Sequence, residues 1–268
     1  MRTLAFILVT FWTLQVHAVD LQGKFTQGAL IIGKTSSTTK IALDGRPIRV
    51  SPDGDFVFGF GRDAPASATL KIERPGHAVE ERKLVIAARE YQIQSIDGLP
   101  PRMVTPPKSV LDRIKRENGT IAKLRAEDSP MVHFRGTWLR PSNGRVTGVY
   151  GSQRILNGKP RRPHFGIDFA APSGAPVVAP MGGKIVLAHK DMYYSGGTII
   201  LDHGHGLTSA FLHLSALSVK VGQIVSRGQK IGAIGATGRA TGPHLDWRIN
   251  WFEQRVDPAY LLPANALN

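Results

Sequence analysis

The chain has 268 residues, a formal net charge of +14 and no cysteine. This length allows one large domain or two small ones, and 42% hydrophobic residues suit a soluble globular protein. The lack of cysteine excludes a fold held by disulfides, so packing must stabilise it. The positive charge suits a polyanionic partner such as nucleic acid or an envelope polymer.

Residues 1–18 have the pattern of a secretory signal peptide. Arg2 precedes an apolar run from Leu4 to Val16, and the small residue Ala18 offers a cleavage point. The run is shorter than the roughly 20 residues that a spanning helix needs. We therefore expect an exported protein of the bacterial periplasm or cell envelope, with no transmembrane span after signal removal. Export, and basic residues spread along the chain, favour an anionic cell-wall or envelope surface and no nucleic acid as partner.

Residues 19–98 predict a small β-sandwich domain. Short apolar or alternating runs, such as 56–60 and 68–72, are separated by turn signals, such as those at 44–45 and 75–76. Short strands at this spacing are typical of a sandwich. The segment contains no catalytic cluster, so it could bind substrate, cover a groove or act as a spacer.

Residues 99–130 predict a linker followed by a basic helix. Two Pro-Pro pairs bracket the linker, and the helix is expected over 108–125. Ser109 is the candidate N-cap, answered by Asp112 three residues later. Asn118-Gly119 is a weak point inside the helix. Its charges are most simply a solvated face.

Residues 131–268 return to a β pattern, with paired short strands and glycine corners. Segment 154–159 is expected to be a loop. His203 and His205 lie in a glycine-rich turn and are expected to be structural. The paired strands resemble the barrel-sandwich halves of biotinyl and lipoyl carriers. The predicted fold class is therefore all-β with a short helical linker: an N-terminal β-sandwich and a C-terminal barrel-sandwich domain.

Three motifs in this last segment carry histidine and aspartate. His164 and Asp168 lie four residues apart, and His213 lies in an apolar run. His244 and Asp246 lie two apart in a strand pattern, and alternation along a strand sends both to the same face. Each motif alone is more simply a hydrogen-bonded core or surface group. Three of them within one glycine-rich region favour a shared metal site.

These motifs resemble those of the lysostaphin- and LytM-type zinc endopeptidases. Segments 164–177, 211–215 and 241–246 are similar to the family's first, second and third motifs, in the same order and spacing. The resemblance extends roughly from Gly144 to Leu262. It implies a duplicated hybrid motif fold for the C-terminal domain, one Zn2+ per chain, and peptidoglycan peptide stems as substrate.

The same resemblance implies roles for individual residues. His164 and Asp168 would be zinc ligands, and His213 and His244 would be the catalytic histidines. The family's third motif usually reads His-x-His, and its second histidine binds zinc, whereas this chain has Asp246 there. Zinc accepts a carboxylate oxygen at about the distance of an imidazole nitrogen, so Asp246 is the expected third ligand. Its negative charge should weaken the Lewis acid, which predicts weaker metal affinity or a more alkaline optimum.

The expected function is hydrolysis of peptidoglycan peptide cross-links by a zinc-activated water. The alternative is a catalytically weak or inactive wall-binding protein that activates a partner hydrolase. Such relatives generally lose several site residues, whereas only Asp246 departs here, so the enzyme is favoured. Tyr193, Tyr194 and Asn157 are further candidates for the substrate groove, and packing or turn chemistry explains each of them equally well.

Overall fold

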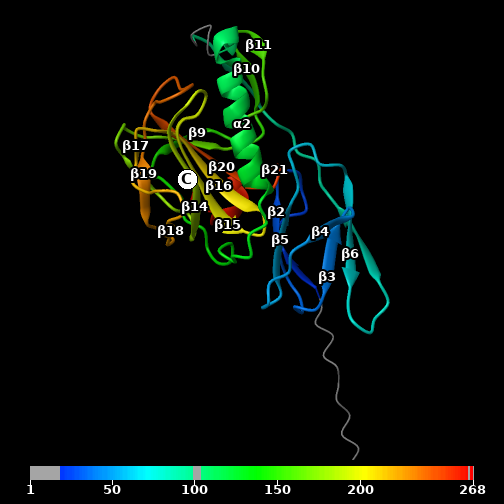
Figure 1. Cartoon of the computed structure of the whole chain (residues 1–268). Helices are drawn as coiled ribbons and strands as arrows, with labels where there is room; N and C mark the ends of the chain where they lie inside the picture. The colour runs from blue at the N-terminus through cyan, green and yellow to red at the C-terminus, as the bar shows by residue number, and fades with distance from the viewer. Residues whose placement is uncertain (1–18, 99–103, 265, 268) are drawn as a thin grey trace, which may run out of the picture.

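The computed structural model describes residues 19–98, 104–264 and 266–267. Over these residues the protein is mostly β, with one α-helix that falls between two groups of sheets in the sequence (Figure 1). The expected signal peptide, residues 1–18, lies outside the described residues. In the described ranges, no helix combines the length and apolar character needed to cross a membrane.

Two antiparallel sheets form the N-terminal part, in the orders β1-β2-β5 and β4-β3-β6-β7. Their strands are β1 (Asp20–Gln22), β2 (Leu30–Lys34), β3 (Lys40–Leu43), β4 (Arg46–Ile48), β5 (Asp55–Gly59), β6 (Ser67–Glu73) and β7 (Glu80–Val85). In β6 the alternate residues Ala68, Leu70 and Ile72 are buried, as the period of two of a half-buried strand requires. The predicted N-terminal β structure is confirmed.

The basic segment forms a 3-10 turn, η1 (Lys108–Val110), and then α2 (Leu111–Ala126). The predicted cap is wrong, because Ser109 lies inside the 3-10 turn and Val110 takes the N-cap position without a side-chain bond. The helix also continues through Asn118-Gly119. A glycine inside a helix costs only about 1 kcal/mol, which tertiary packing can offset.

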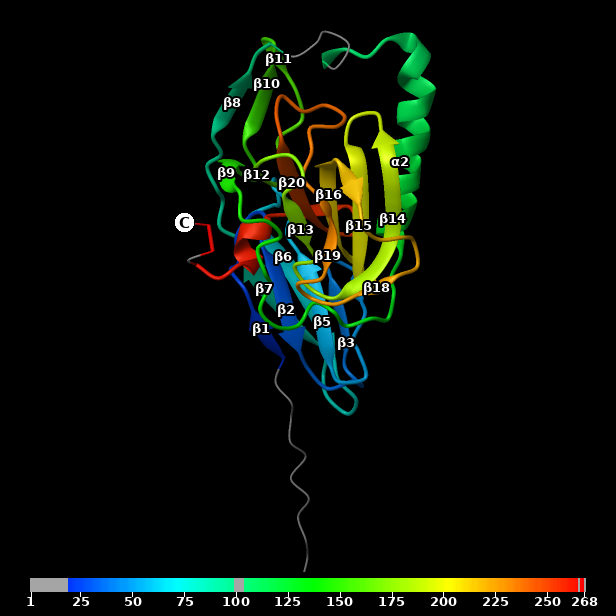
Figure 2. The same cartoon turned by 90° about the vertical axis from the view of Figure 1, so that its left-hand side faces the viewer.

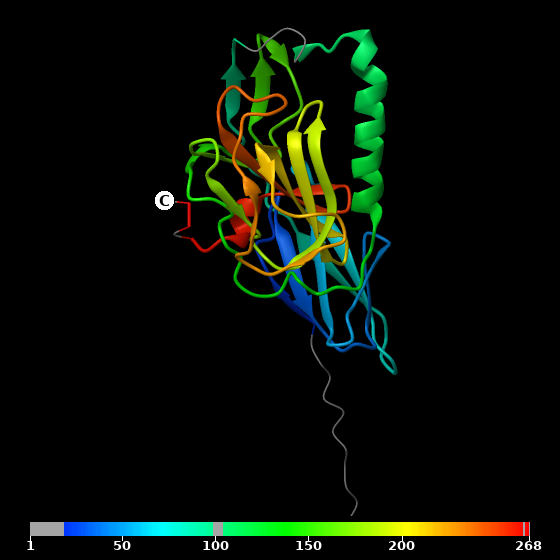
Figure 3. The same ribbon diagram turned by 60° about the vertical axis from the view of Figure 1, so that its left-hand side comes forward.

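That packing comes from the large sheet of the C-terminal part. Ile121 and Leu124 of α2 contact a small apolar cluster that contains Ile200 and Leu212. Figures 2 and 3 show α2 standing along one side of this sheet. The helix therefore packs an apolar stripe on the sheet, and Arg113 and Glu117 add polar contacts to Asp191 and to the amide of Tyr193.

The C-terminal part is built on an eight-stranded sheet with the path β18-β14-β15-β16-β20-β12-β9, and β21 pairs with β20. Its strands are β9 (Arg145–Gly148), β12 (Ile167–Ala170), β14 (Gly183–Met192), β15 (Gly196–Gly204), β16 (Leu207–Leu214), β18 (Ile224–Val225), β20 (His244–Trp251) and β21 (Gln254–Val256). A three-stranded sheet accompanies it: β13 (Pro176–Val178), β19 (Lys230–Ala233) and β17 (Ala216–Leu217). Every residue of β15 and β16 is buried, so these two central strands lie within the core.

A third sheet corrects the expected loop. Residues 154–159 belong to a hairpin of β10 (Gln153–Leu156) and β11 (Lys159–Pro160). Asn157 and Gly158 both have positive φ, as a two-residue hairpin turn requires. β8 (Ile93–Ile96), from the segment assigned to the N-terminal domain, pairs parallel with β10. Strand pairing therefore crosses the predicted domain boundary at residue 98.

The two parts of the chain also share one hydrophobic core. Phe58 and Leu70 of the N-terminal sheets belong to the same cluster as Trp247 and Val256 of the C-terminal part. The last element in the described residues is a 3-10 turn, η2 (Pro258–Leu261), capped by Asp257. The N-terminal sheets are thus packed against the C-terminal part, which contains the site.

Candidate metal centre and active site

Two neighbouring strands bring the acidic residues together. β12 and β20 pair antiparallel, and their register sets Asp168 opposite Asp246. Opposite residues of an antiparallel pair project from the same face of the sheet. His164 precedes β12, and its ring reaches the same point. The expected convergence of distant segments is therefore present.

Three potential ligand atoms of these side chains lie within 4.8 Å of one another. Nε2 of His164 is 3.0 Å from Oδ1 of Asp168 and 3.5 Å from Oδ1 of Asp246. All three residues are buried, and Nε2 of His164 and Oδ1 of Asp168 have no hydrogen-bond partner among the described residues. Buried acceptor atoms this close together repel one another, so they are stabilised by a cation that binds between them. An imidazole with two carboxylates is a donor set that suits zinc, so the residues fit a metal site.

The ring of His164 is held from its other side. Its Nδ1 lies 3.2 Å from the carbonyl oxygen of Val149. Because that oxygen can only accept, Nδ1 carries the proton and Nε2 presents its lone pair to the carboxylates. Burial alone would lower the pKa of His164, but the carboxylates of Asp168 and Asp246 outweigh burial and raise it.

Each carboxylate is also paired with an arginine. Nη2 of Arg154 donates to Oδ2 of Asp168 at 3.0 Å. Nε of Arg248 donates to Oδ1 and Oδ2 of Asp246 at 2.9 and 3.1 Å. Burial alone would raise the pKa of Asp246, but Arg248 and His164 hold it well below its usual range. Asp246 is therefore ionised near neutral pH, although it is buried.

Two glycines allow this close packing. A Cβ atom at Gly166 would lie 2.5 Å from Oδ1 of Asp246. A Cβ atom at Gly148 would collide with the carboxylate of Asp168. A larger residue at either position would displace a carboxylate, which explains the glycine between His164 and Asp168 in the first motif.

His213 and His244 lie beside each other, with ring centroids 4.8 Å apart. Nδ1 of His213 is 2.8 Å from the carbonyl oxygen of Thr237, and Nδ1 of His244 is 2.9 Å from that of Gly242. Nδ1 of each ring therefore carries the proton that its carbonyl oxygen accepts. Burial lowers the pKa of His213 to about 4, so this ring is neutral near pH 7.

The two histidines and Asp168 line one cavity of about 300 Å³. Polar side chains from several segments complete its wall: Gln94, Thr147, Arg154, Arg239 and Thr241. The candidate groove residues Tyr193, Tyr194 and Asn157 are not among the residues that line this cavity, and Asn157 lies in the turn between β10 and β11. The ring of Tyr194 lies against the guanidinium of Arg239, and the guanidinium carbon is 4.5 Å from the ring centroid.

His203 and His205 take the structural positions that were expected. Nδ1 of His203 is 2.7 Å from the carbonyl oxygen of Gly182, and its Nε2 is 2.7 Å from the hydroxyl of Ser209. The ring of His205 packs against Phe134, with centroids 5.0 Å apart. Neither lines the cavity.

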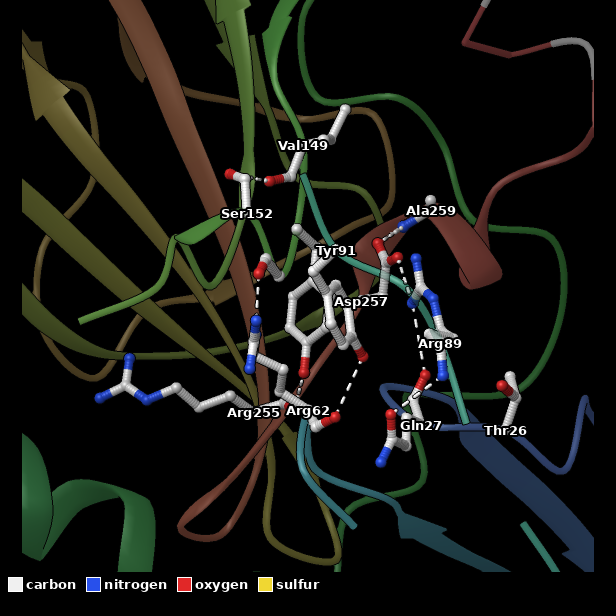
Figure 4. A network of polar contacts seen from close by, with 12 residues as sticks. Thr26, Gln27, Arg62, Arg89, Tyr91, Val149, Ser152, Arg255, Asp257 and Ala259 are labelled. Carbon is white, nitrogen blue, oxygen red and sulfur yellow. Dashed lines mark hydrogen bonds and ion pairs between the residues drawn. The ribbon is translucent and has the colours of Figure 1, made fainter. Parts of the chain in front are cut away.

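A chain of hydrogen bonds connects the N-terminal sheets to His164, and Figure 4 shows part of it. Nε of Arg62 donates to the carbonyl oxygen of Gly151 at 2.7 Å. The amide of Gly151 donates to the carbonyl oxygen of His164 at 2.7 Å, and the amide of His164 donates to that of Ser152 at 2.9 Å. The hydroxyl of Ser152 donates at 3.0 Å to the carbonyl oxygen of Val149 that holds the imidazole.

Sequence reasoning missed Arg248, Arg154 and the carbonyl of Val149. Arg248 had a signal, because it follows Asp246 by two residues in a strand and so shares its face. Arg154 had none, because its segment was expected to be a loop. A backbone carbonyl has no sequence signature at all.

Comparison with known proteins agrees with this geometry. A family model described as peptidase family M23 matches residues 162–258. Peptidoglycan DD-endopeptidase ShyB of Vibrio cholerae is 36% identical over 153 residues, which are 53% of this chain and 36% of ShyB. Peptidoglycan DD-endopeptidase ShyA of the same species is 46% identical over 87 residues, 32% of this chain and 20% of ShyA. The chain thus matches only a minor part of either relative's length.

The fold comparison reaches further along the chain. A crystal structure of a Pseudomonas aeruginosa protein assigned to the M23 peptidases aligns with a TM-score of 0.70 and 29% identity. The alignment covers 90% of this chain and 96% of the other, so it includes the N-terminal sheets. Through residues 162–258, which hold the metal site of His164, Asp168 and Asp246, the chain belongs to peptidase family M23.

Proposed function

We propose that this protein is a zinc-dependent endopeptidase that hydrolyses the peptide cross-links of peptidoglycan. The observation that carries the proposal is the buried group of His164, Asp168 and Asp246 beside a cavity that His213 and His244 line. The descriptions of ShyA and ShyB as peptidoglycan DD-endopeptidases support the same substrate class.

One zinc ion per chain is the proposed cofactor. Nε2 of His164 and one carboxylate oxygen each of Asp168 and Asp246 would hold it. When bound, zinc supplies Lewis-acid chemistry, which brings the pKa of a water molecule to about 7 and polarises a carbonyl group. Arg154 and Arg248 keep the two carboxylates in position, as hydrogen-bonded partners of metal ligands do.

His213 and His244 are the proposed proton-transfer residues. Nε2 of His213 is unprotonated near pH 7, so it can orient a water molecule and take its proton. Nε2 of His244, in the same cavity wall, can donate to the developing oxyanion once it is protonated, or pass that proton to the leaving amine. Either ring can serve in either step, because the two lie side by side.

We place this activity in the bacterial cell envelope. Peptidoglycan lies outside the cytoplasmic membrane, which agrees with the export signal expected from residues 1–18. A net charge of +14 would attract the protein to an anionic envelope surface.

Zinc content and turnover of purified cross-linked muropeptides test the proposal. We expect about one zinc per chain and hydrolysis that stops on chelation and returns with zinc. Asp246→Ala should lose both zinc and turnover. His213→Ala should keep zinc and lower kcat by at least about 100-fold. Asp53→Asn, at an exposed turn far from the site in sequence, is the control that should change neither.

Two results would contradict it. Full zinc occupancy and full rate in Asp246→Ala would remove Asp246 from the ligand set. A zinc-loaded protein that binds cell wall but leaves muropeptides intact would overturn the enzyme and favour the wall-binding activator.

A further inference from the structure

Arginine side chains gather at the proposed substrate cavity. Arg154 of β10 and Arg239, from the segment between β19 and β20, line it. Arg161 and Arg248 lie near enough to act electrostatically on Arg239. These four residues come from different strands and loops, so the fold itself brings them together.

The negative charge in the cavity wall is already paired with neighbouring side chains. Among the described residues of its wall, Asp168 is the acidic one, and its oxygens face His164 and Arg154. A divalent ion at the metal site would add positive charge. The loaded cavity therefore has an excess of positive charge, and such a field favours an anionic ligand.

Both the backbone and the side chain of Arg239 are held in place. Its amide donates to the carbonyl oxygen of Tyr194 at 2.8 Å, and its guanidinium lies against the ring of the same tyrosine. Burial lowers the pKa of Arg239, and the guanidinium groups of Arg154, Arg248 and Arg161 lower it further. The guanidinium of Arg239 thus stands in the positive field of three other arginines, beside the cavity that it lines.

Arg154 is held as well, because one of its amino groups bonds to Asp168. A guanidinium has five N–H donors in a rigid plane, so one fixed bond orients the remaining donors. Guanidinium groups bind carboxylates through paired hydrogen bonds. Two oriented guanidinium groups in one cavity wall thus match a carboxylate better than a neutral amide.

We propose that Arg239, together with Arg154, forms a subsite for a free carboxylate of the substrate peptide close to the bond that is cut. This inference rests on the proposed hydrolase. Such a subsite makes the enzyme prefer cross-linked peptides that have a free carboxylate beside the cross-link. The same peptides with a carboxamide at that place are poorer substrates. Arg239 acts as a substrate-binding residue, and Arg154 additionally positions Asp168.

The test uses the zinc-loaded full chain and two synthetic cross-linked peptides that differ only in this group, carboxylate or carboxamide. We expect wild type to show a kcat/KM about tenfold or more higher for the acid. Arg239→Gln should lower the acid's kcat/KM to the level of the amide, mainly through KM, and change the amide less than twofold. Arg239→Lys, which keeps the charge, should restore part of the preference.

Arg162→Gln is the matched control, because Arg162 is exposed on the same basic loop as Arg161 and does not line the cavity. It should leave both substrates unaffected. Equal turnover of acid and amide by wild type would overturn the carboxylate subsite while leaving the hydrolase in place. An equal loss on both substrates in Arg239→Gln would show that Arg239 only supports the structure.

A binding measurement separates the two proposals if neither peptide is cut. Calorimetric titration of the zinc-loaded chain with each intact peptide then measures the affinity to which the subsite contributes. Tighter binding of the acid than of the amide, lost in Arg239→Gln, supports the subsite although the hydrolase has failed. Equal binding of the two peptides overturns it.

Discussion

Asp246 is the residue at which this chain departs from the His-x-His pattern, and Arg248 is its partner. The sequence alone predicts a weaker Lewis acid, because a third ligand with negative charge neutralises the ion formally. Arg248 contacts both oxygens of Asp246 and offsets that charge. The expected alkaline shift should therefore be smaller than the ligand set alone implies.

Removing Arg248 should destabilise the metal-free protein more than the zinc-loaded protein. Arg248→Met leaves the buried carboxylate of Asp246 without its cation, and breaking such a pair costs about 3 kcal/mol or more. Zinc would compensate the same carboxylate. We expect urea denaturation to show a clearly larger loss of stability in the metal-free than in the zinc-loaded variant. An equal loss in both forms would mean that the carboxylate does not face the metal.

His203 should make stability depend on pH. Burial lowers its pKa to about 4, against about 6.5 in an unfolded chain. Between these values the unfolded chain binds a proton that the folded chain does not, so the free energy of unfolding falls as pH falls from 6.5 to 4. The loss is on the order of 3 kcal/mol.

Urea denaturation of wild type and His203→Gln at pH 7 and pH 4.5 measures this contribution. The variant should lose less stability between the two pH values than wild type does. The remaining dependence would include His213, whose pKa is also lowered to about 4. An identical pH dependence in the two proteins would show that His203 does not titrate in this window.

Among the elements, the loop at 149–152 links the N-terminal sheets to the metal site. Arg62 binds the carbonyl of Gly151, and its guanidinium carbon lies 4.1 Å from the ring centroid of Tyr91. A Cβ atom at Gly151 would collide with that same ring. The loop is thus clamped between Arg62 and Tyr91, and its carbonyl at Val149 orients His164.

Loosening this clamp should weaken metal binding. We expect Arg62→Gln to raise the zinc Kd about tenfold, since loss of a partner behind a metal ligand typically costs 10–100-fold in affinity. Competition with a chromophoric chelator measures it. Arg46→Gln is the matched control, because Arg46 also spans the two parts of the chain, at 2.7 Å from Glu253, without touching the loop. A similar rise in both variants would indicate general loosening of the interface.

Local patterns predicted most elements, and the exceptions have physical causes. β6 and β20 follow alternation and turn signals that single sequences contain. β10 was missed because a two-residue turn at Asn157-Gly158 joins very short strands, which look like a loop. Its pairing with β8 depends on residues far away in sequence, and a local pattern cannot specify that register.

The residues of the site likewise fall into those that local patterns predict and those that they do not. The histidines and aspartates were predicted because side chains with metal chemistry stand at fixed spacings, and strand alternation placed His244 and Asp246 on one face. The arginines around the cavity were not predicted. Their role depends on tertiary placement, and a basic residue in a chain of net charge +14 carries no distinguishing signal.

At the scale of the whole molecule, the shared core implies one folding unit. The N-terminal sheets and the C-terminal part contribute to a single hydrophobic cluster, and Arg89 and Asp257 form an ion pair of 2.9 Å between them. We expect one calorimetric transition, with calorimetric and van't Hoff enthalpies in agreement. Zinc should raise the midpoint of that whole transition. Two resolved transitions, of which zinc moves only one, would contradict a shared core.

The parallel pairing of β8 with β10 has a consequence for how the chain reaches its final state. Ile93 and Gln153, which are aligned in that pair, are about 60 residues apart in sequence. Closing so long a loop is entropically unfavourable, and non-local pairings slow folding. Because Gln94 and Arg154 from these strands line the cavity, a refolding chain should bury its tryptophans before it acquires a shape that can hold a peptide.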